Sequence, residues 1–109
     1  MQIGCHCGAT IFDGTDNLPQ KAHLIPDQDW LAVCDAIDDQ VIDPVADGSL
    51  DRQAAYHRAR HIIGRPARRM WQCVACGRIY IDGHNSELRC FVPADDEPDR
   101  AILRGSAAS

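Results

Sequence analysis

The sequence predicts an α+β domain in which the N- and C-terminal segments form an antiparallel sheet and a two-helix insert lies between them. Three observations lead to this prediction. Cysteine pairs followed by glycine stand near both ends, short apolar stretches flank them, and the middle of the chain changes to a helical period. A chain of 109 residues has the length of one domain. We expect that domain over residues 1–93, followed by an acidic, mobile tail over 94–109.

Short strands are expected at both ends of the chain. Residues 1–12 alternate loosely between apolar and polar and stop at Asp13-Gly14, a turn dipeptide. Residues 15–26 contain prolines and few apolar side chains, so we expect a surface loop there. For residues 70–92 the sequence predicts a strand, a turn that carries Cys73 and Cys76, a second strand, a further turn and a third strand.

The insert is expected over about residues 27–64. Apolar side chains recur every three or four residues after Asp27, which predicts an amphipathic helix that Asp27 caps and that ends near Asp43-Pro44. A second helix is expected from Ser49, as its cap, to Gly64. The residues expected to be prominent in the core are Trp30, Ile37, Ile62, Ile63, Trp71, Ile79, Ile81 and Val92.

Four of the six cysteines have the spacing of a metal site. Cys73 and Cys76 enclose two residues and precede a glycine, so the chain can turn around an ion. Cys5 and Cys7 enclose one residue, and side chains two apart in an extended segment point the same way. Four thiolates satisfy a tetrahedral Zn²⁺ ion, so we expect one structural zinc. Cys34 and Cys90 are expected to be ordinary core thiols.

These two turns, each followed by glycine and a short apolar strand, resemble the knuckles of the zinc ribbon family. The resemblance covers about residues 1–14 and 70–92, and it implies a split ribbon whose halves lie on either side of the helical insert. Zinc ribbons usually place two residues between both pairs of cysteines, so the single residue between Cys5 and Cys7 is a departure. Rubredoxin-like iron sites use similar knuckles, which leaves iron as the alternative to zinc.

Charge is sorted along the chain, whose net charge is −5. Residues 13–51 hold ten acids and one lysine. A face of one sign speeds and selects association with a partner of the other sign, so we expect a protein partner. The residues expected to bind it are Asp27, Asp29, Asp35, Asp38, Asp39 and Asp43. In composition the chain resembles small acidic bacterial immunity and antitoxin-type proteins, which implies a basic toxin domain as the partner and its neutralisation as the function.

Nucleic-acid binding is the alternative function. Seven arginines and no acid lie in residues 52–78, from Arg52 to Arg78, and such a strip can contact phosphates. The overall acidic charge argues against it. A solvated or internally paired face is the commoner outcome of such a run.

Catalysis is expected to be absent, and so is a small-molecule substrate. A redox dithiol needs its first cysteine at a helix N-terminus, whereas Cys73 stands between strands, and four protein thiolates leave a zinc ion no open position for water. Thiol redox chemistry is therefore a third and less favoured function. The apolar runs are too short for a membrane span and the N-terminus does not resemble a signal peptide, so we expect a cytoplasmic protein.

Overall fold

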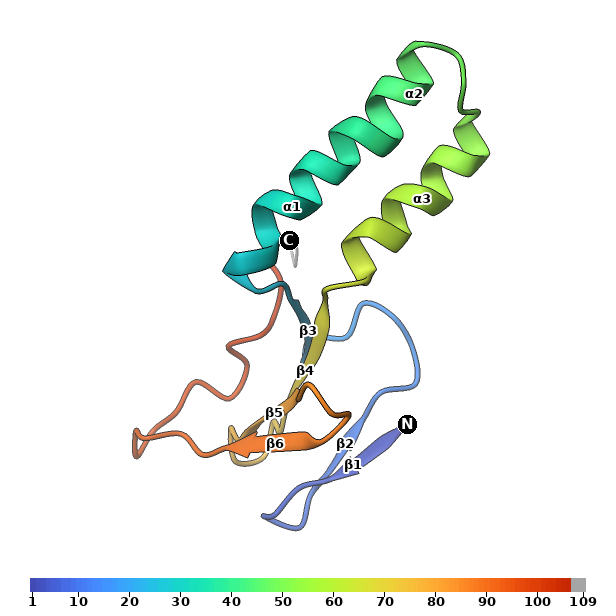
Figure 1. Ribbon diagram of the computed structural model, residues 1–109. Coiled ribbons are helices and arrows are strands. Elements are labelled where there is room, and N and C mark those ends of the chain that lie inside the picture. Colours follow the sequence, from blue (N-terminus) through green and yellow to red (C-terminus); the bar gives the residue numbers. More distant parts are fainter. Residues whose placement is uncertain (107–109) are drawn as a thin grey trace. The chain divides into compact units, whose positions relative to one another are not determined.

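The chain folds into two compact units in the computed structural model, which describes residues 1–106. One unit contains residues 1–24 and the chain from residue 68 onward, and the other contains residues 25–67 (Figure 1). The first holds antiparallel strands and the second holds helices, so the predicted α+β class is confirmed. The boundary at residue 93 stays a prediction. No helix within residues 1–106 is long and apolar enough to cross a membrane.

The strand unit contains two sheets rather than the one that was expected from the terminal segments. The first is a hairpin of two strands, β1 (Gln2–Gly4) and β2 (Thr10–Phe12). The second has four strands in the order β3 (Lys21–Leu24), β4 (Arg68–Gln72), β5 (Ile79–Asp82) and β6 (Leu88–Phe91).

Strand β3 corrects the loop that was expected over residues 15–26. Its four residues, Lys-Ala-His-Leu, do alternate between polar and apolar, but the run is short and stands between Pro19 and Pro26, so the local strand signal is weak. Pairing with β4 makes the strand, because Lys21 lies opposite Trp71 and Leu24 lies opposite Arg68 in an antiparallel register. The Gln72 N–H continues the ladder to the Gln20 carbonyl at 2.8 Å.

The core of the strand unit brings the two sheets together. Two of the predicted metal ligands belong to it, so packing and the cysteine site share the same side chains. Its buried members are Ile3, Cys5, Ile11, Trp71, Cys73 and Tyr80. The core prediction holds for Trp71, which is fully buried, but was wrong for Trp30, Ile63 and Val92, which are exposed. Trp30 and Ile63 lie on the two arms of a helical hairpin. Each arm packs against only one other helix of that unit, so part of its apolar surface stays in contact with solvent.

The helical unit is an antiparallel hairpin (Figure 1). A two-helix insert was expected here, and the packing of its helices on the sheet stays a prediction. Its first arm is continuous through α1 (Asp27–Ile37), a π-helical turn η1 (Asp38–Ile42) and α2 (Asp43–Ala46), and its second arm is α3 (Arg52–Gly64). The first arm therefore passes the end that was expected at Asp43-Pro44. Both α1 and η1 pack against α3, around the buried side chains of Val33, Val41 and Ala55.

The π-helical turn has a local cause at Pro44. Proline has no N–H, and its ring collides with the carbonyl four residues earlier in a regular α-helix, which here belongs to Gln40. The wider turn accommodates the ring, and the Gln40 oxygen instead accepts a hydrogen bond from Arg58 Nη1 at 3.0 Å. Arg58 thus ties α3 to the first arm where the backbone ladder is interrupted.

The helix caps differ from the expected ones. Asp51, not Ser49, caps α3, because its Oδ1 accepts the Ala54 N–H at 2.9 Å. Ser49 belongs to the preceding turn, where its N–H donates to Asp47 Oδ1. Asp27 is the first residue of α1, and Pro26 occupies the cap position without a side-chain hydrogen bond.

Candidate metal centre

The structure brings the four predicted cysteine ligands together. The Sγ atoms of Cys5, Cys7, Cys73 and Cys76 all lie within 4.8 Å of one another, although the two pairs are separated by more than 60 residues of sequence. The Cys5 and Cys76 sulfurs are 3.6 Å apart, and the Cys7 and Cys73 sulfurs are 3.7 Å apart. A tetrahedron of thiolates with metal–sulfur bonds of ~2.3 Å has edges of about 3.8 Å. The cluster therefore has the dimensions that a four-coordinate ion requires.

Each pair of cysteines lies on a turn with the same hydrogen-bond pattern. In the first turn the Cys5 N–H donates to the Ala9 carbonyl and the Gly8 N–H donates to the Cys5 carbonyl. In the second, the Cys73 N–H donates to the Arg78 carbonyl and the Gly77 N–H donates to the Cys73 carbonyl.

The two turns differ by one residue in length. Gly8 is three residues after the first cysteine of its turn, and Gly77 is four residues after. Both glycines have positive φ, 97° and 86°, a conformation that other L-residues adopt at a cost. The single residue between Cys5 and Cys7 thus gives a shorter version of the same knuckle, in which both sulfurs still reach the cluster.

Hydrogen bonds in the cluster favour thiolates at some positions and oppose them at others. Burial acts to raise the pKa of the Cys5 thiol, but donors at its sulfur, chiefly the Cys7 N–H and the Tyr80 hydroxyl, lower it to about 6. Burial also opposes ionisation of Cys76, and the backbone and side chain of Arg78 outweigh it, so that this pKa is lowered too. At Cys73 burial dominates and raises the pKa to about 12. A cation at the centre would supply the charge that the buried Cys73 needs to ionise.

Tyr80 is a part of the site that the sequence reasoning missed. Its hydroxyl accepts the His6 N–H at 3.0 Å and bonds the Cys5 sulfur, and its ring stacks on the His6 ring with centroids 6.2 Å apart. The residue is buried, and burial raises the pKa of its hydroxyl, so the hydroxyl stays a proton donor. Its position in an alternating strand just after the second knuckle was the available signal.

Gln72, directly before Cys73, is a second residue that the sequence reasoning missed. Its side chain is 2 % exposed, its Nε2 donates to the Gly77 and Asp99 carbonyls at 3.2 and 2.9 Å, and its Oε1 accepts the Ile102 N–H at 3.0 Å. The segment around residues 98–104 is therefore hydrogen-bonded to the second knuckle. The mobility expected for 94–109 stays a prediction, and residues 107–109 lie outside the described part of the chain.

The other predicted site residues lie in the helical unit, away from the cysteines in sequence. All six acids of the predicted partner-binding face are exposed on α1, η1 and the start of α2: Asp27, Asp29, Asp35, Asp38, Asp39 and Asp43. The thiols of Cys34 and Cys90 are partly buried, and Cys90 packs against the core of the strand unit.

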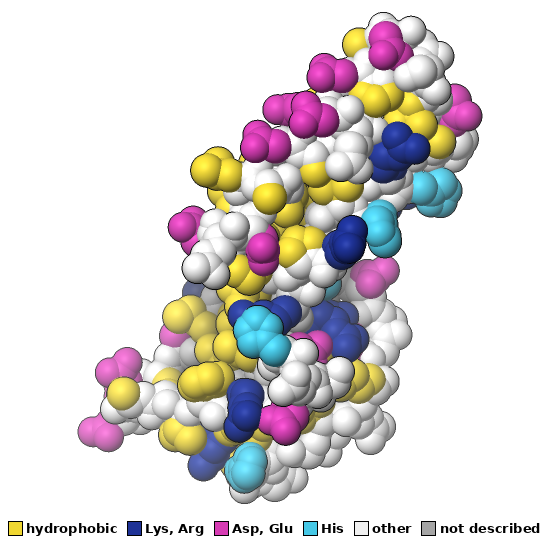
Figure 2. Space-filling view, viewed as in Figure 1, with side chains coloured by type: hydrophobic (Ala, Val, Ile, Leu, Met, Phe, Trp, Pro, Cys, Tyr) yellow, Lys and Arg dark blue, Asp and Glu magenta, His cyan; other side chains and the backbone are white. Residues whose placement is uncertain are grey.

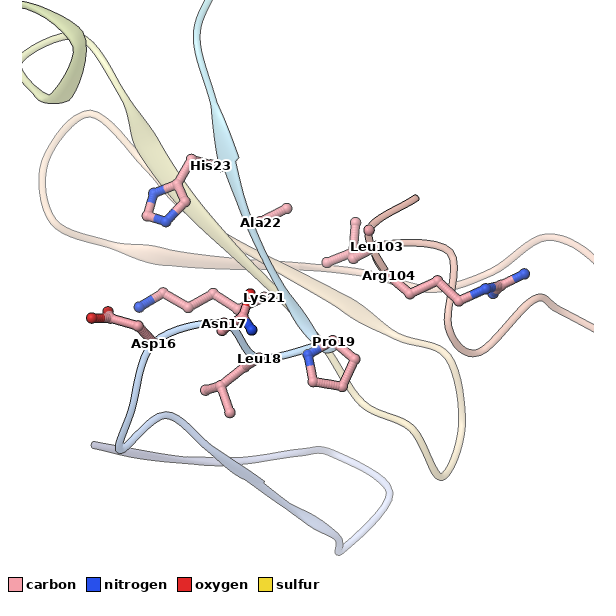
Figure 3. Close-up of a pocket in the computed structure, with 10 residues that line it drawn as sticks. Asp16, Asn17, Leu18, Pro19, Lys21, Ala22, His23, Leu103 and Arg104 are labelled. Carbon is pink, nitrogen blue, oxygen red and sulfur yellow. The ribbon is translucent and has the colours of Figure 1, made fainter. Parts of the chain in front are cut away.

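A depression lies beside strand β3. It lies between the residues before β3 and the segment 103–105, and Lys21 and Arg104 extend in opposite directions from it (Figure 3). Lys21 is paired with Asp13 at 3.0 Å and Arg104 with Asp99 at 3.3 Å. The two cations therefore do not converge on an anion in this depression.

Fold and site together define a class of protein: an α+β domain with a cluster of four cysteines that could hold a metal ion such as zinc, and with a helical hairpin as its insert. The chain belongs to the family described as a domain of unknown function (DUF8617), whose model matches residues 1–96. Among curated proteins and among solved structures, none matches the chain. The zinc ribbon relationship stays a resemblance of the two knuckles.

Proposed function

We propose that the chain is a non-catalytic protein, stabilised by one structural Zn²⁺ ion, that binds a basic protein partner through the acidic arm of its helical hairpin. The observation that carries the proposal is the charge of that arm. Residues 25–51 contain eight aspartates and neither lysine nor arginine. Among the described residues, none of these aspartates forms a salt bridge.

Unpaired acids within residues 1–106 are not peculiar to this arm, since Asp16, Asp95, Asp96 and Glu97 of the strand unit also form no salt bridge. The arm differs in holding eight acids with neither lysine nor arginine. The described salt bridges all join residues of the strand unit, such as Lys21 with Asp13 and Arg69 with Asp82. Acids without internal partners are free to meet a cationic surface, which accelerates encounter and selects the partner. Neutralisation of a basic toxin domain is the particular form of this function that the composition favours.

Zinc has a structural role in this proposal. Four thiolates complete a tetrahedral coordination shell, so a bound ion has no open position for water or substrate. Iron in the same four thiolates is the alternative metal. The ion would join the two ends of the strand unit and thereby hold β3 and β4, from which the hairpin starts and to which it returns.

Nucleic-acid binding has less support from the geometry. The arginine strip is divided, because Arg52, Arg58, Arg60 and Arg65 belong to the helical unit whereas Arg68, Arg69 and Arg78 belong to the strand unit. Arg69 is bonded to Asp82 at 3.1 Å, and the neighbouring cysteines, chiefly Cys76, raise the pKa of the Arg78 guanidinium.

The proposal is tested with two charge reversals of equal size. The full-length, zinc-loaded chain is used to isolate its partner from the source cells, and the affinity is then measured by calorimetry. One variant carries Asp29→Lys, Asp35→Lys and Asp39→Lys. The matched control carries Asp95→Lys, Asp96→Lys and Glu97→Lys, three exposed acids outside the hairpin.

The expected result is a basic protein partner whose affinity falls about 100-fold or more in the hairpin variant and by less than about threefold in the control. Equal losses in both variants, or none in the hairpin variant, would refute the proposal. Duplex DNA and single-stranded RNA oligonucleotides are titrated in parallel. Tight, strongly salt-dependent binding that Arg58→Ala and Arg60→Ala weaken would favour the nucleic-acid function instead.

A further inference from the structure

The helical hairpin has an apolar groove between its two arms, near the turn that joins them. Its apolar lining residues include Val41, Ile42, Val45, Ala55, Tyr56 and Ala59, and Arg52 lines it as well. Ile42, Val45 and Tyr56 are 55 %, 44 % and 49 % exposed, although large apolar side chains gain most from burial. The groove therefore offers an apolar surface to a partner.

The small core of the hairpin makes this exposure costly. Within residues 25–67, all of which the structure describes, the buried side chains are Val33, Val41 and Ala55. Two amphipathic helices with so little shared core gain stability when a further layer covers them, as the second pair of helices does in a four-helix bundle.

The two edges of the hairpin carry opposite charges. Acidic side chains follow the edge formed by α1 and η1, and arginines and histidines follow the edge formed by α3, with apolar side chains between them (Figure 2). A surface with an acidic edge, an apolar centre and a basic edge is complementary to a copy of itself after a twofold rotation.

Asp38 and Arg60 mark these edges at the groove. Asp38 is the first residue of the π-helical turn η1, which also contains Val41 and Ile42 of the groove. Arg60 lies at the other border, since its guanidinium carbon is 6.0 Å from the centroid of the Tyr56 ring.

The two residues lie on the same side of a contact between the arms. Arg58 Nη1 donates to the Gln40 carbonyl across the arms. Because the arms are antiparallel, Asp38, two residues before Gln40, and Arg60, two residues after Arg58, both lie further from the joining turn than this contact.

We propose that a second copy of the chain covers this groove and forms a twofold-symmetric four-helix bundle with the two hairpin turns at the same end. This symmetry axis runs along the helices and places the acidic arm of one copy against α3 of the other. A twofold axis perpendicular to the helices would instead place the acidic arms of the two copies against each other, where like charges repel. The chosen axis also brings Asp38 opposite the partner's Arg60, once on each side of the bundle.

This pairing goes beyond the proposed function and does not depend on it, and it engages only Asp38 of the six acids of the predicted partner-binding face. A separate depression of the hairpin is lined by Asp29, Ala32 and Ala36 from the first arm and by His61 and Ile62 from α3. It has no lining residue in common with the apolar groove. Asp29 thus stays available to another protein when the groove is covered.

The test is sedimentation equilibrium of the purified, zinc-loaded full-length chain from about 2 to 200 µM, with no other protein present. We expect twice the mass of one chain at the upper concentrations. Val45→Glu and Tyr56→Glu, which place charge in the groove, are expected to weaken self-association at least about 100-fold. Ala32→Glu, in the other depression, is the matched control and leaves the dimer intact. Circular dichroism and metal content establish that each variant is folded.

Charge exchange tests the arrangement of the helices. Asp38→Arg alone and Arg60→Asp alone are each expected to weaken the dimer about tenfold, because two pairs become repulsive. The double variant Asp38→Arg/Arg60→Asp restores it to within about threefold. A monomer at 200 µM, or a dimer indifferent to both groove variants, overturns the proposal. A double variant without recovery overturns the arrangement with both turns at one end.

Discussion

Trp71 donates its indole N–H to Asp13 Oδ2 at 2.9 Å, and this hydrogen bond joins the first hairpin to the four-stranded sheet across 58 residues of sequence. Lys21 contacts both oxygens of the same carboxylate, with its ammonium 3.1 Å from Oδ1 and 3.0 Å from Oδ2. The Asp13 side chain is only 8 % exposed. A single carboxylate therefore binds β3 and β4 to the end of β2.

Asp13→Asn should destabilise the protein at neutral pH, and the difference from wild type should disappear in acid. The bonds from Trp71 and then Lys21 lower the pKa of Asp13. A lowered pKa contributes stability above the pKa of the unfolded chain, ~3.9, and that contribution is lost as the pH falls through the still lower folded value. Urea unfolding at pH 7, 5 and 4 and below measures the difference. Loss of metal in acid affects both proteins alike, and a difference that grows in acid would contradict the prediction.

Metal content provides the second prediction. Plasma emission spectrometry should find one zinc ion per chain, and removing it should lower the apparent stability by about 10 kcal/mol. Because thiols must lose protons to bind, zinc affinity should fall as the pH falls. Cys73→Ser should lose both metal and cooperative unfolding, whereas Cys34→Ser should retain both. A folded, zinc-loaded Cys73→Ser protein would disprove the tetrathiolate centre.

The two knuckle glycines form a matched pair for a third prediction. Gly8→Ala meets no atom within 4 Å and should cost only the strain of positive φ, about 1–2 kcal/mol. At Gly77 a Cβ would meet side-chain carbons of Pro98, Arg100 and Pro93 at 3.2–3.3 Å. Gly77→Ala should therefore cost about 1 kcal/mol more. Thermal unfolding of the zinc-loaded proteins measures both, and equal costs would mean that the segment around Pro98 does not pack on the knuckle in solution.

The cap of α3 gives a fourth prediction. Asp51→Ala should destabilise the helical hairpin by about 1 kcal/mol, because the Ala54 N–H loses its acceptor. Asp51→Asn keeps an acceptor oxygen and should recover most of this loss. Ser49→Ala is the control and should change stability by less than about 0.5 kcal/mol. A larger effect at Ser49 than at Asp51, measured by urea unfolding, would restore the cap that the sequence pattern suggested.

Gln72 gives a fifth prediction, which concerns the C-terminal segment. Gln72→Leu removes both the donor to Asp99 and the acceptor for Ile102, so trypsin should cut after Arg100 and Arg104 about tenfold faster. Gln53→Leu, the same change at an exposed position of α3, should leave these rates unaltered. Mass spectrometry of timed digests measures them. Unaltered rates in Gln72→Leu would show that its hydrogen bonds do not restrain the segment.

The parts of the fold that the sequence predicted are those with local signals. The spacing of Trp30, Val33 and Ile37 has the helical period, and the Cys-x-x-Cys-Gly turn at Cys73 has its own geometry. These signals were enough to predict both helices and the second knuckle. They were also enough to predict the four cysteines of the cluster, since the local turn of each pair directs both of its thiols to the same side.

The features that were missed depend on residues distant in sequence. Strand β3 depends on its pairing with β4, because four alternating residues, Lys-Ala-His-Leu, are too short a run to predict a strand by themselves. The helix α3 is capped by Asp51, two residues after the predicted cap Ser49. Ser49 instead belongs to the preceding turn, where its N–H donates to Asp47 Oδ1. Tyr80 and Gln72 gained their roles from atoms up to 74 residues away. Local pattern cannot supply such partners.

Leu24 and Arg68, the residues that flank the helical hairpin, are direct neighbours in the antiparallel register of β3 and β4. Neighbours of that kind lie about 5 Å apart, a gap that a two-residue turn can also close. The hairpin is thus attached to the strand unit like a long loop at the end of a β-ribbon. Evolution could lengthen, shorten or exchange it while the cysteine centre stayed as it is, so members of one family could keep a common base and address different partners.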